Sequence, residues 1–311
     1  LIILFDAMSK TKGILYAAVS SSTFGLAPFF SIMLLTTGFS SFEVLSYRWG
    51  VASATLILFG LISGCSFRLN KKDFGTVFLL SLFRAATSLS LVIAYQNIAS
   101  GVASIIHFMY PLGVALAMML FFHEKKSLWT ITAILASIAG AVFLSSGDIS
   151  HSGGTVGIIA ACISVFSYGG YIIGVRKSRA VQINSTVLTC YVMGIGALLF
   201  IICGSFTSGI RIVTDWNTWL YILGLALPAT AISNMALIKA IKHIGPTLTS
   251  IFGAMEPLTA VIIGTLIFQE LFTLKSVIGI VLIVTAVTIV VFREKRSAIN
   301  DHSSSTANHL P

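Results

Sequence analysis

The sequence predicts an all-α integral membrane protein of ten transmembrane helices, built as two inverted-topology repeats of five helices. Three observations support this: the composition, a series of long apolar runs, and self-similarity at a nearly constant offset. Of the 311 residues, 56% are hydrophobic and only 9% are charged, and the mean hydropathy is +0.98. A soluble domain carries about 25% charged residues. The composition therefore excludes an ordinary water-soluble protein.

Ten apolar runs have the length of about 20 residues that a helix needs to cross a hydrocarbon core about 30 Å thick. They cover residues 13–35, 41–64, 73–97, 101–122, 127–146, 154–175, 186–208, 217–241, 246–269 and 274–292. The connections between them are too short for a soluble catalytic or nucleotide-binding domain. We therefore divide the chain into an N-terminal segment (1–12), a first repeat (13–146), a second repeat (154–292) and a basic, then disordered polar tail (293–311).

The basic residues lie almost entirely at alternate ends of these runs. One side has only Arg211 and Lys275. The other has fifteen: Lys10, Lys12, Arg68, Lys71, Lys72, Lys125, Lys126, Arg176, Lys177, Arg179, Lys239, Lys242, Arg293, Lys295 and Arg296. By the positive-inside rule both termini are cytoplasmic, and we expect a multipass protein of a bacterial inner membrane. The net charge of +9 is thus an orientation signal, and no nucleic-acid partner is expected.

The first apolar run is too long for a signal peptide and lacks a cleavage site, so we expect it to stay in the protein. Met8 is a candidate for the true start. The four cysteines, Cys65, Cys162, Cys190 and Cys203, have no CxxC spacing and no histidine partner. We interpret them as small core residues, and the sequence predicts neither a metal site nor a cofactor.

The internal repeat is visible as matched residues at a constant spacing. The first and second runs match the sixth and seventh at an offset of 144, and the later runs match at 146. The pairs include Gly13 with Gly157, Ala17 with Ala161, Phe24-Gly25 with Tyr168-Gly169, Tyr47 with Tyr191, Ala94 with Ala240, Ile98 with Ile244, and Pro111-Leu112 with Pro257-Leu258. Because five spans is an odd number, the second copy must enter the membrane from the opposite side, as in many secondary transporters.

Several motifs carry a family resemblance over residues 13–292. Each fourth span has a Pro-Leu pair followed by a glutamate at its end, namely Pro111 with Glu124 and Pro257 with Glu270, and the second span contains Arg48. In these features the chain resembles bacterial double EamA-domain permeases of the drug/metabolite transporter superfamily. The resemblance implies a ten-helix basket whose central cavity is lined by the first, third and fourth helices of each half. It also implies movement of small metabolites by alternating access.

Three polar residues are predicted to share the midplane of the membrane. At about 1.5 Å per residue, Arg84 lies about 16 Å from the cytoplasmic end of its span and Glu256 about 15 Å along its own, with Tyr110 at a similar depth. Arg84 could bind a substrate carboxylate or phosphate, and Glu256 could bind a substrate ammonium or exchange a proton. Alternatively, Arg84 and Glu256 could neutralise each other as a buried pair.

The remaining polar residues of the spans, and two prolines, are predicted to support or line the site. Arg48 is expected to snorkel or to pair with Glu43. His107 could titrate in the cavity, or it could be a neutral histidine hydrogen-bonded between helices. Matched kinks at Pro111 and Pro257 are predicted to shape the site. Further candidates for the polar lining are Tyr95, Tyr168, Tyr171, Asn234 and Gln96.

The function predicted from these residues is secondary transport of a small polar metabolite, such as an amino acid, with export as the expected direction. Protons are a candidate coupling ion. An importer or exchanger of the same fold is the alternative. A membrane-embedded enzyme is disfavoured because the spans have no nucleophile–base pair, no paired aspartates and no phosphate loop. A channel is disfavoured because the two halves carry unequal polar residues. No oligomeric state is predicted.

Overall fold

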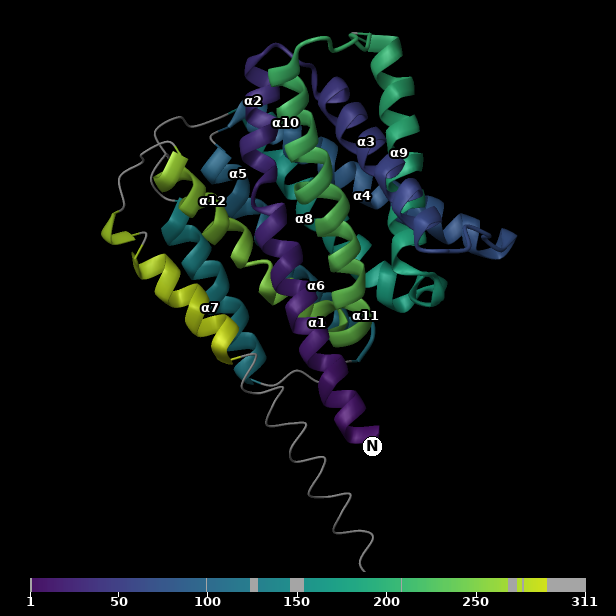
Figure 1. Ribbon diagram of the computed structural model, residues 1–311. Coiled ribbons are helices and arrows are strands. Elements are labelled where there is room, and N and C mark those ends of the chain that lie inside the picture. Colours follow the sequence, from purple (N-terminus) through teal and green to yellow (C-terminus); the bar gives the residue numbers. More distant parts are fainter. Residues whose placement is uncertain are drawn as a thin grey trace, which may run out of the picture.

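The protein is a bundle of helices, seen in the computed structural model in Figure 1. The structure describes residues 2–98, 100–123, 128–145, 154–207, 209–267, 273–275 and 277–289, and these ranges contain no β-strand. Glu124, Glu270 and the predicted tail, 293–311, lie outside the described residues.

The described residues of the first repeat form the helices α1 (Ile2–Phe24), α2 (Ala27–Thr36), α3 (Ser41–Ile62), α4 (Lys71–Asn97), α5 (Ser100–His107), α6 (Tyr110–Leu120) and α7 (Leu128–Ser145). A capping box formed by Ser40 and Glu43 starts α3, because each residue's side chain accepts a backbone N–H of the other. Short breaks separate α1 from α2 and α5 from α6, and each break precedes a proline, which cannot donate to the helix ladder.

The second repeat has the same plan. It contains α8 (Thr155–Lys177), the 3₁₀-helix η1 (Arg179–Gln182), α9 (Ser185–Thr207), α10 (Trp216–Ala226), the π-helix η2 (Leu227–Ile232), α11 (Ser233–Phe252), α12 (Met255–Ile267) and a further apolar helix, Val277–Ile289. Asp215 caps α10, and the hydrogen bonds donated by Thr218 lower the pKa of this carboxyl group. Gly245, at φ 79°, kinks α11 ahead of Pro246.

Six of the described helical segments are long and apolar enough to cross a membrane: Met8–Thr36, Ser41–Ile62, Lys71–Asn97, Thr155–Lys177, Ser185–Thr207 and Trp216–Phe252. Tyr110–Leu120, Leu128–Gly140 and Val277–Ile289 are shorter apolar helices. Large apolar side chains face outward, among them Phe166 and Phe206, which are 78% and 87% exposed. This surface is suited to lipid, so the chain is a multipass membrane protein. The count of ten spans stays a prediction.

The internal repeat is also a repeat of contacts. Gly13 of α1 packs against Ile244 of α11, and the matched Gly157 of α8 packs against Ile98 of α4. The hydroxyl of Tyr47 donates to the carbonyl of Arg211, at 2.5 Å. The matched Tyr191 hydroxyl donates to the carbonyl of Phe67, at 2.6 Å, 144 positions before Arg211. Each of these contacts joins one repeat to the other.

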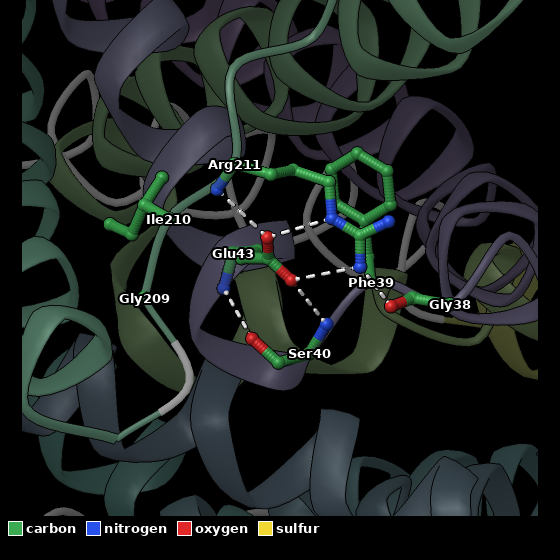
Figure 2. Close-up of a pocket in the computed structure, with 7 residues that line it drawn as sticks. All are labelled: Gly38, Phe39, Ser40, Glu43, Gly209, Ile210 and Arg211. Atoms are coloured by element: carbon green, nitrogen blue, oxygen red, sulfur yellow. Dashed lines mark hydrogen bonds and ion pairs between the residues drawn. The ribbon is translucent and has the colours of Figure 1, made fainter.

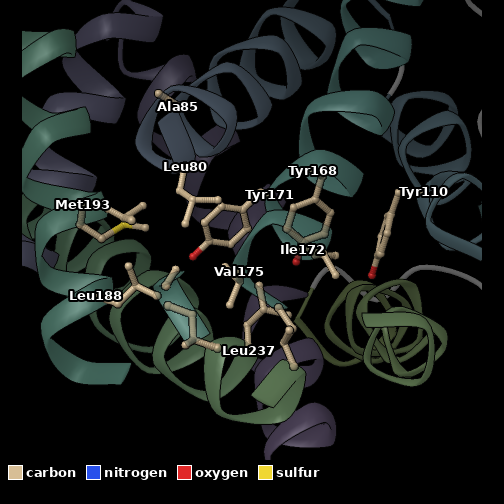
Figure 3. Packing of buried hydrophobic residues seen from close by; sticks show 14 of the residues in the cluster. Leu80, Ala85, Tyr110, Tyr168, Tyr171, Ile172, Val175, Leu188, Met193 and Leu237 are labelled. Atoms are coloured by element: carbon tan, nitrogen blue, oxygen red, sulfur yellow. The ribbon is translucent and has the colours of Figure 1, made fainter. Parts of the chain in front are cut away.

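The largest apolar core lies where the repeats meet. It contains Leu80 of α4, Tyr171 of α8 and Leu237 of α11, all buried. Figure 3 shows Leu80 beside Tyr171, with Leu237 further along the same cluster. The core therefore holds helices of the two repeats together around the polar residues described below.

One close contact in this core sets a limit on side-chain size. A Cβ atom on Gly196 of α9 would overlap the ring of Trp49 of α3, which is fully buried. We therefore expect Gly196→Val to lower the free energy of unfolding by about 1–3 kcal/mol through overpacking. Thermal unfolding in detergent measures the loss of stability in Gly196→Val. Gly75→Val is the control, since no atom lies within 4 Å of a Cβ there; equal loss in both variants would contradict the prediction.

The cysteines only partly match the expectation. All four are free, but only Cys190 is buried, whereas Cys162 and Cys203 are exposed and Cys65 is intermediate. The interpretation of all four as core residues is wrong. In lipid an exposed thiol costs little, so an apolar sequence context does not distinguish the core from the lipid-facing surface.

Candidate functional site

Arg84 is the centre of a buried polar cluster. Its side chain is 1% exposed on α4. Its Nε donates to Oδ1 of Asn234 on α11, at 2.7 Å, and its Nη1 donates to the hydroxyl of Ser88, at 3.3 Å. The guanidinium carbon lies 5.3 Å from the ring centroid of Phe24 and 5.2 Å from that of Tyr168. Arg84 is therefore held by neutral partners and aromatic faces from three other helices.

Local geometry orients these partners. Ser88 follows Arg84 by four residues, so the two side chains lie on one face of α4. The amide nitrogen of Asn234 donates to the carbonyl of Thr230, at 2.7 Å, which directs the amide oxygen toward Arg84. Asn234 is 0% exposed.

Arg48 is a second buried guanidinium in the same region, 4% exposed on α3. Its Nε donates to the Thr230 hydroxyl, at 2.6 Å, and its Nη2 to the Ala229 carbonyl, at 3.5 Å. Both partners belong to η2, a π-helix, and such helices often occur at functional sites. The Arg48 guanidinium lies 5.7 Å from the Phe24 ring centroid, so Phe24 contacts both arginines.

Neither role expected for Arg48 is found, because its side chain is buried rather than extended to the membrane surface and does not pair with Glu43. Glu43 instead forms an ion pair with Arg211, at 2.9 Å. Residues five apart on a helix point about 140° away from each other. Glu43 also accepts the backbone N–H of Ser40 as part of the capping box, which directs its carboxylate toward the end of the helix.

Tyr110 and Glu256 occupy matched positions in the two repeats and meet in the structure. The Tyr110 hydroxyl donates to Oε1 of Glu256, at 3.5 Å. Tyr110 is 2% exposed, whereas Glu256 is only half-buried. Glu256 lies in the first turn of α12, where the helix dipole favours a carboxylate. A Cβ on Gly253 would overlap the Tyr110 hydroxyl, so glycine is needed at this break.

Arg84 and Glu256, both among the described residues, form no ion pair with each other, unlike Glu43 with Arg211 and Asp73 with Arg179. Arg84 uses Asn234 and Ser88 instead. The direct neutralising pair, one of the two roles left open by the sequence, is therefore not formed in this structure.

His107 connects the cluster to α8. Its Nδ1 shares a hydrogen bond with the Ser164 hydroxyl, at 2.8 Å, and its ring centroid lies 5.3 Å from those of Tyr110 and Tyr168. Its Nε2 is buried and has no hydrogen-bond partner among the described residues. This geometry is that of a histidine hydrogen-bonded between helices.

The other predicted lining residues divide into two groups. Tyr171 is fully buried, and its ring centroid lies 6.0 Å from the guanidinium carbon of Arg84. Tyr95 is half-buried and interacts electrostatically with Glu256 and Arg48. Gln96 is exposed and accepts a hydrogen bond from Ser41, away from the cluster.

Phe24, Ser88 and Thr230 belong to the cluster but were not among the predicted site residues. The sequence does contain an indication for Phe24, because the internal repeat matches it with Tyr168. In the structure the two rings stack, with their centroids 6.3 Å apart. For Ser88 and Thr230 no signal was present, since hydroxyl residues are frequent in the spans.

The cluster has a defined origin and charge. Its residues come from α1 and α8, from α4, η2 and α11, and from α5, α6 and α12, which lie along the first, third and fourth predicted spans of the two repeats. Arg48 adds a contribution from α3. The cluster holds two guanidinium groups, Arg48 and Arg84, and one carboxylate, Glu256, and no acidic residue forms an ion pair with either guanidinium in the described ranges. Groups of three or more metal-ligating residues are also absent from those ranges. The arrangement can bind a small anionic or zwitterionic group.

A repeated bundle of apolar helices with a buried polar cluster at the junction of its halves defines a membrane transport protein. The chain belongs to the EamA-like transporter family, whose model matches residues 11–146 and 155–292.

Known proteins agree with this assignment. Two Archaeoglobus fulgidus proteins, each described as an uncharacterized transporter, are similar to the chain. One is 26% identical over 241 residues (75% of this chain, 83% of the relative), and the other is 23% identical over 276 residues (88% and 96%). A solved structure, described only as the crystal structure of a protein, shares the fold, with a TM-score of 0.77 at 17% identity over 93% of this chain and 98% of its own. The protein is thus a membrane transporter.

Proposed function

We propose that the protein is a secondary transporter that exports a small zwitterionic metabolite, of the amino-acid class, across a bacterial inner membrane by alternating access. The observation that carries this proposal is the pair of buried guanidiniums, Arg48 and Arg84, bound only by neutral groups among the described residues. A buried charge without a counter-ion is costly. A substrate carboxylate would supply the missing counter-ion, and Glu256, half-buried nearby, would receive the substrate ammonium or a proton.

Counterflow in proteoliposomes tests the substrate class. Vesicles loaded with an unlabelled metabolite should accumulate the same labelled metabolite transiently, and amino acids should be active where organic cations are not. Activity with cationic compounds alone would contradict the zwitterion proposal. Direction is tested in cells, where an exporter lowers the internal concentration of its substrate and an importer raises it.

Alternating access requires that the two repeats separate on each face in turn, and one end of the bundle has a contact suited to this step. Arg211, in the connection between α9 and α10, donates from Nε and from its backbone N–H to Oε1 of Glu43, at 2.9 and 3.0 Å. Its guanidinium also contacts the Gly38 carbonyl and lies 4.5 Å from the Phe39 ring centroid. These residues border a cavity of about 500 Å³ (Figure 2).

The contact is specific to one end. At the matched positions of the opposite end stand Val187 and Phe67 in place of Glu43 and Arg211. A longer pair, Asp73 with Arg179 at 3.8 Å, joins the repeats there with side chains that are 24% and 57% exposed, and solvent-accessible pairs of this kind contribute little. We propose that the Glu43–Arg211 contact is a latch that closes the outer end of the transporter.

Arg211→Gln should therefore increase access to the bundle from outside. We expect labelling of a cysteine at Ser31, buried in α2, by a membrane-impermeant maleimide to rise about tenfold, since the buried Glu43 carboxylate would lose its half-exposed partner Arg211 and truncating one member of a hydrogen-bonded charge pair shifts such an equilibrium by more than about 1 kcal/mol. The background is a chain without its four native cysteines. Lys275→Gln, at the other predicted outer basic residue, is the control. Unchanged labelling in Arg211→Gln would contradict the latch.

A further inference from the structure

A cluster of basic side chains lies at the end of the bundle where α1 and α11 meet. The ring of His243 on α11 stacks with that of Tyr16 on α1, with centroids 6.0 Å apart, and its Nδ1 shares a hydrogen bond with the Ser9 hydroxyl, at 2.8 Å. Nζ of Lys239 lies 5.0 Å from the Tyr16 ring centroid. His243 also interacts electrostatically with Lys12, Lys239 and Lys242.

Arg176 of α8 extends this cluster, because its Nη1 donates to the carbonyl of Lys242, at 2.7 Å. Lys12, Arg176 and His243 are exposed, and Lys239 and Lys242 are half-exposed. Among the described residues no carboxylate lies within salt-bridge distance of these side chains. We refer to Lys12, Arg176, Lys239, Lys242 and His243 as the basic cluster.

The internal repeat shows that the fold itself does not need this charge. The opposite end of the bundle has the same packing, with Gly157 against Ile98 in place of Gly13 against Ile244. Yet the residues that match Lys239, Lys242 and His243 there are neutral, namely Ile93, Gln96 and Asn97. The matched helix contact at the opposite end is therefore formed with neutral residues at these three positions, so helix packing does not account for the charge of the cluster.

The position of the cluster indicates its ligand. The basic residues lie at the ends of apolar spans on the side that carries most of the basic loops, and an aromatic ring, Tyr16, lies among them. Basic side chains at this depth meet the headgroup region of the cytoplasmic leaflet, where anionic lipids concentrate. We infer that the basic cluster binds the phosphate of an anionic phospholipid headgroup and that the bound lipid joins α1 of the first repeat to α11 and α8 of the second.

Lipid binding by the purified protein tests this inference independently of transport. Native mass spectrometry and thermal unfolding in detergent are carried out with added phosphatidylglycerol or phosphatidylcholine. We expect phosphatidylglycerol to bind more strongly and to raise the unfolding temperature. Lys12→Gln/Lys239→Gln should weaken this binding about tenfold or more, because each basic side chain contributes to attraction of an anionic headgroup.

The matched control is Lys71→Gln/Lys72→Gln, which removes two exposed lysines at the start of α4 on the same predicted side. It should retain phosphatidylglycerol binding. Equal loss in the two double variants would mean nonspecific attraction and would overturn the site. Equal stabilisation by inorganic phosphate would also overturn it, since the ligand would then be a soluble anion. Either failure leaves the proposed transport function standing, because that is measured by counterflow.

Discussion

Arg84→Gln is expected to abolish substrate transport while leaving a folded protein in the membrane. The variant retains an amide donor for Asn234 but loses the positive charge and the planar fork that binds a carboxylate. Removing one partner of a buried charge pair costs about 2–5 kcal/mol. Counterflow should therefore fall by about 100-fold or more, whereas the free energy of unfolding should change by only about 1–3 kcal/mol, the cost of altering buried hydrogen bonds.

Two further variants separate a role in binding from a role in folding. Arg84→Lys keeps the charge without the fork, so we expect weaker apparent substrate affinity rather than complete loss. Ser81→Ala removes a hydroxyl that is also fully buried on α4 but bonds only to the Val77 carbonyl of the same helix; its transport should be normal. If Arg84→Gln transported substrate normally and lost only stability, the carboxylate-binding role would be wrong.

The membrane class, the repeat and the family follow from the sequence because each depends on a pattern spread over many residues. Apolar length is set by the thickness of the bilayer, and matched pairs such as Gly13 with Gly157 recur as equivalent contacts in the structure. The family assignment is confirmed by the match over both repeats. These features do not require any single side chain to be placed correctly.

Side-chain partners could be predicted much less well. For Arg48 the sequence predicts either snorkelling or pairing with Glu43, yet the capping box turns Glu43 toward Arg211 and the π-helix η2 provides oxygen atoms for Arg48. Nothing in the sequence indicates a π-helix at residues 227–232. Asn234 was named only as a lining residue, because its bond to Arg84 depends on how α11 is rotated relative to α4.

Glu256→Gln should separate proton coupling from substrate exchange. Glutamine keeps an acceptor for the Tyr110 hydroxyl, whose bond to Oε1 is 3.5 Å long, but it cannot release or take up a proton. A proton gradient of one pH unit can support about tenfold accumulation per proton. If Glu256 is the proton carrier, the variant should still catalyse counterflow, and its gradient-driven accumulation should fall to the level of equilibration.

Tyr110→Phe is the control for this variant, because it removes the donated hydrogen bond but keeps the ring that packs against Tyr168, 4.6 Å away between centroids. Since the carboxyl group remains, accumulation under the gradient should persist at a reduced rate. The pattern of results assigns the role of Glu256. Loss of both counterflow and accumulation in Glu256→Gln would indicate that the carboxylate binds the substrate ammonium. Full accumulation in Glu256→Gln would exclude Glu256 as the proton carrier.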